Sequence, residues 1–140
     1  MVRVVTSKTV NLPTDKVFST IRDIDKLPTL FPDKYKAFKV IERSDKHMIT
    51  EEIVAISGKE IKQKVQHTLE PEKMLRSEVV EGDTKGTTLV IELNPISDSI
   101  TEVKVDADLK FGKIGVVIGI FAKHKIKNEL DKIINQLSKI

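Results

Sequence analysis

The C-terminal stretch, residues 111–140, constrains the fold of this chain more than any other part of the sequence. It begins with an apolar, glycine-punctuated half, FGKIGVVIGIFA, and continues without a break into an amphipathic half, KHKIKNELDKIINQLSKI. A helix that is apolar nearly all round must be enclosed on several sides, whereas an amphipathic helix needs cover along one stripe only. We therefore expect one long C-terminal helix whose first half is wrapped by other elements and whose second half packs along one surface.

The residues before this helix provide a surface that can wrap it. Between residues 35 and 110 the apolar residues recur with a period of two, which is typical of half-buried strands. The expected strands are residues 35–43, 47–57, 60–69, 74–81, 86–94 and 100–110, separated by Ser44-Asp45-Lys46, Ser57-Gly58-Lys59, Glu70-Pro71-Glu72, Gly82-Asp83-Thr84 and Asn94-Pro95. Such short links favour an antiparallel meander.

The N-terminal third is expected to hold one strand and two short helices. Residues 2–10 alternate as a strand, and Pro13 starts a helix from a first-turn position, where its missing N–H costs little. A second short helix is expected over residues 23–31, broken by Pro28 and terminated by Pro32.

The alternation also predicts which side chains face the core. Val103, Val105 and Leu109 fall on the dry face of their strand. In residues 60–69 the dry face is Ile61, Gln63, Val65, His67 and Leu69, so it includes two polar side chains. For the next two strands we place Leu75, Val79, Leu89, Ile91 and Leu93 inside.

That register places Arg76 and Glu78 outside, as a surface ion pair. A register shifted by one residue would instead turn Arg76 inward to hold an acidic head group. Glu51 and Glu52 are consecutive, so one of them points inward unless it lies beyond the cavity edge, and a rim position is the simpler interpretation. An interior carboxylate would be able to act as a general acid or base.

Composition restricts the class of protein. The chain has 140 residues, enough for one domain spanning residues 1–140 with a core of its own. The absence of cysteine excludes disulfides and thiol chemistry and fits a reducing compartment. The N-terminus lacks a signal-peptide pattern and no run of about 18 apolar residues occurs, so we expect a cytoplasmic protein.

The order of elements, strand, two short helices, six-strand meander and long helix, resembles the START-like helix-grip superfamily, also called SRPBCC. The local matches are LPTDKVFSTIRDIDKLPTLFP, the pair GTTLVIELNP and ITEVKVDADLKF, and the glycine-spaced start of the last helix. Similar groups are polyketide cyclase-like, coenzyme Q-binding START-like and CoxG-like proteins. The resemblance implies an α+β fold: a seven-stranded curved antiparallel sheet around the C-terminal helix, enclosing a mostly apolar cavity.

Sequence motifs for catalysis are scarce. The chain has no H-E-x-x-H, no G-x-x-x-x-G-K and no G-x-S-x-G. His47, His67 and His124 are far apart and lack metal-ligand spacing on one element. His47 and His124 are interpreted as surface residues. His67 either bonds to a ligand carbonyl or hydroxyl or is satisfied by neighbouring strands.

Two further patterns have both structural and functional interpretations. The pairs Asp23/Asp25 and Asp106/Asp108 look like metal ligands, but helix capping and an outer strand face explain them. Gly112, Gly115 and Gly119 either permit close packing or leave room for a ligand. We expect no cofactor and no metal.

These observations favour a carrier or sensor of an apolar small molecule such as a lipid, isoprenoid, quinone or polyketide-like compound. The expected ligand-binding residues are Gln63, His67, Val103, Val105, Leu109, Ile114, Val117, Ile118 and Phe121, and the expected cavity entrance is Leu27, Leu30 and Phe31. A cyclase or dehydratase-like enzyme using His67 or an inward glutamate is a second hypothesis, and a protein-interaction module with a filled core is a third.

The expected partners follow from the charge pattern. Aromatic residues are 4% of the chain and basic residues do not cluster with them, so no nucleic-acid partner is expected. Lysines at positions 123, 125, 127 and 132, with others at 34, 36 and 39, are candidates for transient contact with an anionic membrane surface.

Overall fold

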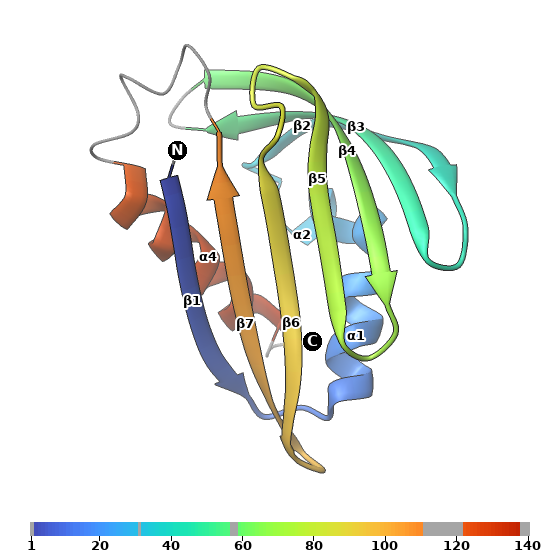
Figure 1. The fold of residues 1–140 in the computed structure, drawn as a ribbon, viewed down its shortest axis with the longest axis vertical. Helices are drawn as coiled ribbons and strands as arrows, with labels where there is room; N and C mark the ends of the chain where they lie inside the picture. The colour runs from blue at the N-terminus through green and yellow to red at the C-terminus, as the bar shows by residue number, and fades with distance from the viewer. Residues whose placement is uncertain (1, 31, 57–58, 111–121, 138–140) are drawn as a thin grey trace.

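The fold is described by a computed structural model, which covers residues 2–30, 32–56, 59–110 and 122–137. Within these residues one antiparallel sheet carries the helices on one of its faces (Figure 1). The strands are β1 (Val2–Val10), β2 (Tyr35–Arg43), β3 (His47–Ile56), β4 (Lys59–Glu70), β5 (Met74–Gly82), β6 (Thr88–Ser97) and β7 (Ile100–Leu109). The helices are α1 (Thr14–Arg22), the 3-10 turn η1 (Ile24–Lys26), α2 (Leu27–Leu30) and α4 (Ala122–Leu137).

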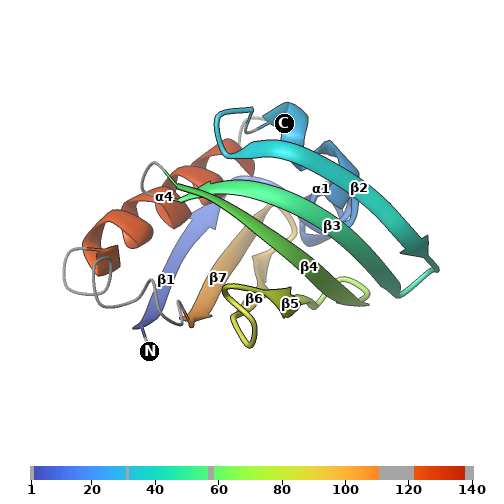
Figure 2. The same ribbon diagram turned by 90° about the horizontal axis from the view of Figure 1, so that it is seen from above.

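The sheet has the order β1-β7-β6-β5-β4-β3-β2, with every neighbouring pair antiparallel. Consecutive strands from β2 to β7 pair through short turns, which confirms the predicted meander. The chain crosses from β1 at one edge to β2 at the other through α1, η1 and α2. The strongly bent sheet therefore places α1 and α4 on the same side (Figure 2).

The helices begin close to where proline chemistry predicts. Pro13 is the N-cap residue of α1, with extended backbone angles (φ −61°, ψ 150°), so it stands one step before the predicted first-turn position. The sequence predicts that Pro28 breaks the second helix, but it does not. The 3-10 turn η1 ends at Lys26, and Pro28 then lies in the first turn of α2, where its missing N–H has no helical acceptor to lose.

Two turns differ from the prediction. The prediction of a turn at Asn94-Pro95 is wrong, because both residues pair with β7 and the chain reverses only at Asp98 and Ser99. β5 pairs with β6 over Thr88–Glu92 alone, so Pro95 lies where β6 has one neighbour and its missing N–H breaks no ladder bond on the open side. The turn after β5 is also longer than expected, and β6 begins at Thr88.

The core lies between the helix-facing side of the sheet and the helices. Val17, Phe18 and Ile21 of α1 are buried, as are Leu130 and Ile134 of α4. These pack with inward residues of the sheet, including Val4, Leu69, Leu75, Ile91, Leu93, Val103, Val105 and Ala107. The predicted inward set on β5 and β6 is confirmed, with Leu89 half-buried.

The C-terminal helix is anchored on β1. Ile134 is fully buried, and the Thr6 hydroxyl donates a hydrogen bond of 2.6 Å to Asp131 Oδ1. The predicted packing of the amphipathic half along the sheet is thus confirmed for Leu130 and Ile134. The predicted enclosure of the apolar half concerns residues 111–121, which lie outside the described residues, as do the side chains of Ile126, Leu137 and Ile140.

Candidate functional site

A chain of hydrogen-bonded polar side chains is buried on the helix-facing side of the sheet. Thr50 and Glu52 come from β3, His67 from β4 and Ser77 from β5. Their inward orientation follows from the register, because Thr50 pairs with buried Val65, and His67 pairs with both Met48 and Ser77. Thr50, Glu52 and His67 are 0%, 5% and 5% exposed, so this polar group is shielded from bulk water.

The Thr50 hydroxyl joins the two titratable groups of this chain. It donates to Glu52 Oε2 at 2.6 Å and lies 2.9 Å from His67 Nε2. The other ring nitrogen of His67, Nδ1, lies 2.7 Å from Ser77 Oγ. The result is a continuous path of hydrogen bonds across three strands, which we call the Ser77–Glu52 chain.

A second series of hydrogen bonds holds Glu52, through Gln63 of β4. Gln63 Nε2 donates to Glu52 Oε1 at 3.1 Å, and the Thr84 hydroxyl donates to Gln63 Oε1 at 3.2 Å. Thr84 is 3% exposed and belongs to the turn after β5. Gly82, which pairs with Gln63, has φ +120°, and a Cβ there would overlap the carbonyl oxygen of Lys62. Glycine is therefore required for the close approach that brings this turn to the site.

The direction of the hydrogen bonds fixes the tautomer of neutral His67. A hydroxyl has one hydrogen, and Thr50 gives it to Glu52, so Thr50 Oγ1 accepts from His67 Nε2. Nε2 of the neutral ring therefore carries the proton, and Nδ1 accepts from the Ser77 hydroxyl. Both ring nitrogens of His67 are satisfied within the protein, which matches the structural interpretation of this residue given by the sequence.

Tyr35 provides the accessible end of the site. It pairs with buried Val54, so it shares the inward face, and its ring packs edge-to-face on Phe38 with centroids 5.8 Å apart. Burial raises the pKa of the Tyr35 hydroxyl well above its usual value, and the charge of Glu52 raises it further. No hydrogen bond joins the Tyr35 hydroxyl to another described residue, and Tyr35 as a whole is half-buried. Toward the described residues, Tyr35 is therefore a neutral donor whose O–H is not engaged.

The described residues do not suggest a metal centre. Within them, three or more His, Asp or Glu side chains do not gather as a metal would need. Asp25 instead pairs with Arg43 at 3.2 Å, so an ion pair and not the expected helix capping engages this side chain, and Asp106 pairs with Arg3 at 2.8 Å. In the same part of the chain, each helix is too short or too polar to cross a bilayer.

Comparison with known proteins assigns the chain to a family. The family model described as polyketide cyclase / dehydrase and lipid transport matches residues 10–133. The chain belongs to this family. None of the curated proteins compared with the chain matches it.

Solved structures share the fold of this family member. A protein from Thermus thermophilus superposes with a TM-score of 0.83 at 14% identity, over 98% of this chain and 94% of that one. A START superfamily protein from Mycobacterium smegmatis superposes with a TM-score of 0.73 at 15% identity, over 98% of this chain and 92% of that one. The Zhui aromatase/cyclase from Streptomyces sp. R1128 superposes with a TM-score of 0.67 at 16% identity, over 97% of this chain and 86% of that one. The expected START-like helix-grip fold is thereby confirmed.

The structure separates the predicted ligand-binding residues into two groups. Gln63 and His67 belong to the polar cluster on β4, whereas Val103 and Val105 are buried in the main core on β7, three strands away. Leu109 is half-buried and packs against that core. Ile114, Val117, Ile118 and Phe121 lie outside the described residues, as does Phe31 of the expected entrance. Leu27 and Leu30 belong to α2, at the end of the sheet that carries β2.

Sequence reasoning missed part of the site. Glu52 is buried, so the rim position favoured for the inward glutamate is wrong, because Thr50 and Gln63 satisfy both of its carboxylate oxygens inside the sheet. Thr50, Ser77, Thr84 and Tyr35 were not singled out. The available signal was the spacing of Thr50 and Glu52, two polar residues on the face that also carries Met48 and Val54. The alternative register for Arg76 is wrong as well, since Arg76 bonds Glu78 at 3.0 Å on the outer face.

Proposed function

We propose that this protein binds an apolar small molecule against the helix-facing side of strands β2 to β5, with the polar cluster orienting the ligand. The observation that carries this proposal is the largely buried Ser77–Glu52 chain, which with Gln63 interrupts an apolar face. Family membership supports the class of function, since the family description includes lipid transport as well as polyketide cyclase and dehydrase activity.

The energetics of the cluster favour a functional role over a stabilising one. Buried polar groups contribute little net stability even when every hydrogen bond is formed, and apolar residues of similar shape are often as stable or more so. A β-sheet core does not need Glu52 and His67, each 5% exposed, at its centre. Departures from local folding rules are expected at functional sites.

The apolar surroundings of the cluster supply the second requirement of a ligand site. Four buried aliphatic side chains on the same strands lie outside the main core cluster: Val54, Ile61, Val65 and Val79. Small-molecule sites are typically lined by apolar side chains with a few placed polar groups. Burial of a ligand against such walls contributes about 25 cal/mol per Å² of apolar surface.

Native mass spectrometry of gently purified protein tests this proposal. We expect an apolar molecule that leaves on denaturation and is identified by solvent extraction, and we expect the stripped protein to bind Nile red. Tyr35 is the only tyrosine and the chain has no tryptophan, so protein fluorescence reports binding next to the site. A stripped protein that neither binds Nile red nor changes its tyrosine fluorescence with apolar ligands would overturn the proposal in favour of a filled core.

Proton transfer on the bound molecule is a second candidate function, favoured by the Thr50 bridge. With one added proton, His67 Nε2–H donates to Thr50 and Thr50 donates to the Glu52 carboxylate. In the alternative arrangement Glu52 O–H donates to Thr50, and Thr50 donates to Nε2. In both, Nδ1–H donates to Ser77, so a proton passes between His67 and Glu52 without breaking the chain.

Exchange of the acidic C–H protons of 2-tetralone in D₂O, followed by NMR, tests this activity. Glu52 would accept the proton from the carbon beside the carbonyl, while the Tyr35 hydroxyl donates a hydrogen bond to the carbonyl oxygen. We expect faster exchange with the protein than with buffer, and loss of that acceleration in Glu52→Gln. The matched control is Glu51→Gln, the same change on the next, outward residue. Equal rates for protein and buffer would exclude the activity for this probe and leave binding as the function.

A further inference from the structure

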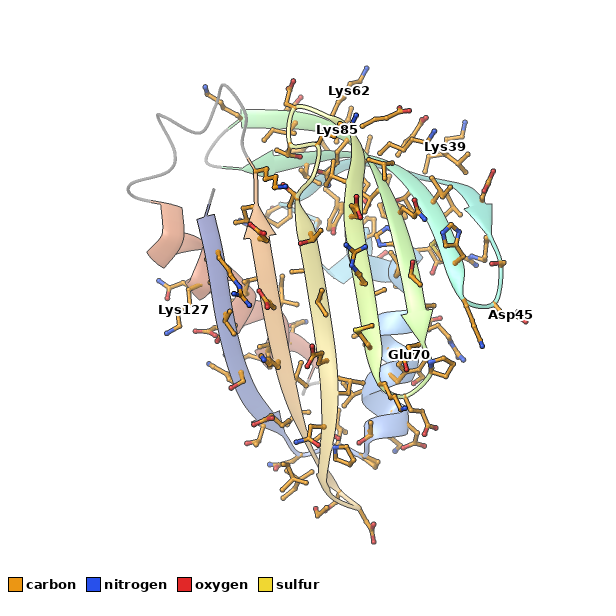
Figure 3. All side chains as sticks on the ribbon, viewed as in Figure 1. Lys39, Asp45, Lys62, Glu70, Lys85 and Lys127 are labelled. Atoms are coloured by element: carbon orange, nitrogen blue, oxygen red, sulfur yellow. The ribbon has the colours of Figure 1, made fainter. Side chains whose placement is uncertain are left out.

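The inward face of β3, β4 and β5 carries one carboxylate and no lysine or arginine among its described residues. The inward positions are Met48, Thr50, Glu52, Val54, Ile61, Gln63, Val65, His67, Leu69, Leu75, Ser77 and Val79. The lysines of neighbouring positions point outward. Figure 3 shows the side chains of Lys39 and Lys62 directed away from the body of the molecule, and both are exposed.

Glu52 and Tyr35 present complementary hydrogen-bonding groups near one another. Tyr35 pairs with Val54, and Glu52 lies two residues before Val54 on the same face, so the two side chains are diagonal neighbours within reach of an aromatic ring. The Tyr35 O–H donates to none of the described residues, so toward them it is an available donor. The Glu52 carboxylate accepts one hydrogen bond at each oxygen, from Thr50 and Gln63, and each oxygen retains a further lone pair.

We propose that this site selects neutral alcohols and phenols with apolar bodies and rejects carboxylate lipids. A ligand hydroxyl accepts from the Tyr35 O–H and donates to Glu52, so it satisfies both groups at once. A ketone uses only the Tyr35 donor. A carboxylate has no proton to give and brings a second negative charge next to Glu52. This inference rests on the proposed function and names the ligand class for the same site.

The electrostatic cost decides the selectivity. Two like charges a few ångströms apart in a partly buried site repel strongly enough to change affinity by at least about tenfold. A cation in contact with both would offset that repulsion, but the described inward positions of β3 to β5 hold only His67, which is already bonded to Thr50 and Ser77. The surface lysines are too well solvated to act across the sheet.

Matched ten-carbon probes test the proposal: 1-decanol, 2-decanone and decanoate, measured by displacement of Nile red and by Tyr35 fluorescence. We expect affinity in the order decanol, decanone, decanoate, with decanoate at least about tenfold weaker than decanol. Glu52→Gln should raise the affinity for decanoate and so reduce the difference in affinity between decanol and decanoate. Glu51→Gln, on the exposed side of β3, should leave the order of the three affinities unchanged. Tyr35→Phe, measured by displacement of Nile red, should weaken the binding of decanol and decanone. The binding of decane, an added probe without a polar group, should not change.

The outcomes separate this inference from the function on which it rests. If none of the probes displaces Nile red and the protein co-purifies with no apolar molecule, the proposed function is wrong. If decanoate binds as tightly as decanol, or if Glu52→Gln and Glu51→Gln behave alike, binding stands and the selectivity is wrong. A folded Glu52→Gln variant, confirmed by an unchanged circular dichroism spectrum, is required for that comparison. If it does not fold, Tyr35→Phe decides, and unchanged decanol affinity in that variant overturns the inference.

Discussion

His67 Nε2 and Glu52 Oε2 lie 3.6 Å apart, with both side chains buried in the sheet. That separation is too long for a good direct hydrogen bond, and the Thr50 hydroxyl, 2.6 Å from one and 2.9 Å from the other, completes the connection. Two titratable groups are thus coupled through a third that does not titrate. The connection between His67 and Glu52 therefore depends on a single hydroxyl.

Replacing Thr50 by valine is therefore expected to destabilise the protein by about 3 kcal/mol. The change keeps the shape of the side chain but leaves Glu52 Oε2 without its donor and His67 Nε2–H without its acceptor. Urea unfolding at pH 7 measures the loss. Thr50→Ser keeps the hydroxyl and should lose about 1 kcal/mol for the missing methyl. Equal stabilities of the valine and serine variants would show that the bridge does not contribute.

The two described histidine rings are expected to hold opposite tautomers when neutral. Neutral His67 carries its proton on Nε2, because Thr50 gives its own hydrogen to Glu52. His47 Nε2 instead accepts from the side-chain amide of Gln66 at 2.8 Å, which leaves its proton on Nδ1. Long-range ¹H–¹⁵N correlation spectra of the imidazoles distinguish the two forms. The same tautomer for both rings would contradict the hydrogen-bond directions assigned to one of them.

The fold could be predicted from the sequence because the patterns that indicate it are local and repeated. Alternation in β4 and β7 identified their inward faces, and short polar links identified the meander. The errors came where local chemistry has two outcomes. Asn94-Pro95 has the composition of a turn, but proline is also tolerated in a strand with one open side, and only the length of β5 decides which applies.

The site could be predicted from the sequence only in part, because its residues are brought together by pairing across strands. The sequence shows that Gln63 and His67 face inward and that Glu51 or Glu52 must do so. It does not show that Thr50 stands opposite Val65, next to His67, since the alternation within each strand does not fix how two strands are aligned. Tyr35 was missed because its strand, β2, has register shifts that hide a period of two.

The ion pair between Arg3 and Asp106 is expected to make a small part of the stability depend on acid pH. The hydrogen bond from Arg3 lowers the pKa of Asp106, and the positive charges of Arg3 and Lys104 lower it further. A lowered folded-state pKa gives stability that is present above the usual aspartate value, about 3.9, and is lost as pH falls through the lower folded value. Arg3→Gln should therefore reduce the urea midpoint at pH 7 more than at pH 2, and ¹³C NMR should show Asp106 titrating at higher pH in that variant.

Tyr35 is expected to keep its proton at pH values where free tyrosine ionises. Burial is the larger cause of its raised pKa, and the negative charge of Glu52 is the second. Because Tyr35 is the only tyrosine, absorbance at 295 nm follows this one hydroxyl in the folded protein. The unfolded chain ionises near pH 10, so the free energy of unfolding should fall as pH rises above about 10, where only the unfolded state loses the proton.

Glu52→Gln separates the two causes of that shift. Removing the charge should move the ionisation of Tyr35 to lower pH, while burial alone still holds it above the value of free tyrosine. Glu51→Gln changes the net charge equally, but from the exposed face of β3, and should leave the titration where it is in the unmodified protein. Identical titrations for these two variants would place the Tyr35 hydroxyl away from Glu52, and the hydroxyl-bridging geometry proposed for the ligand would then be wrong.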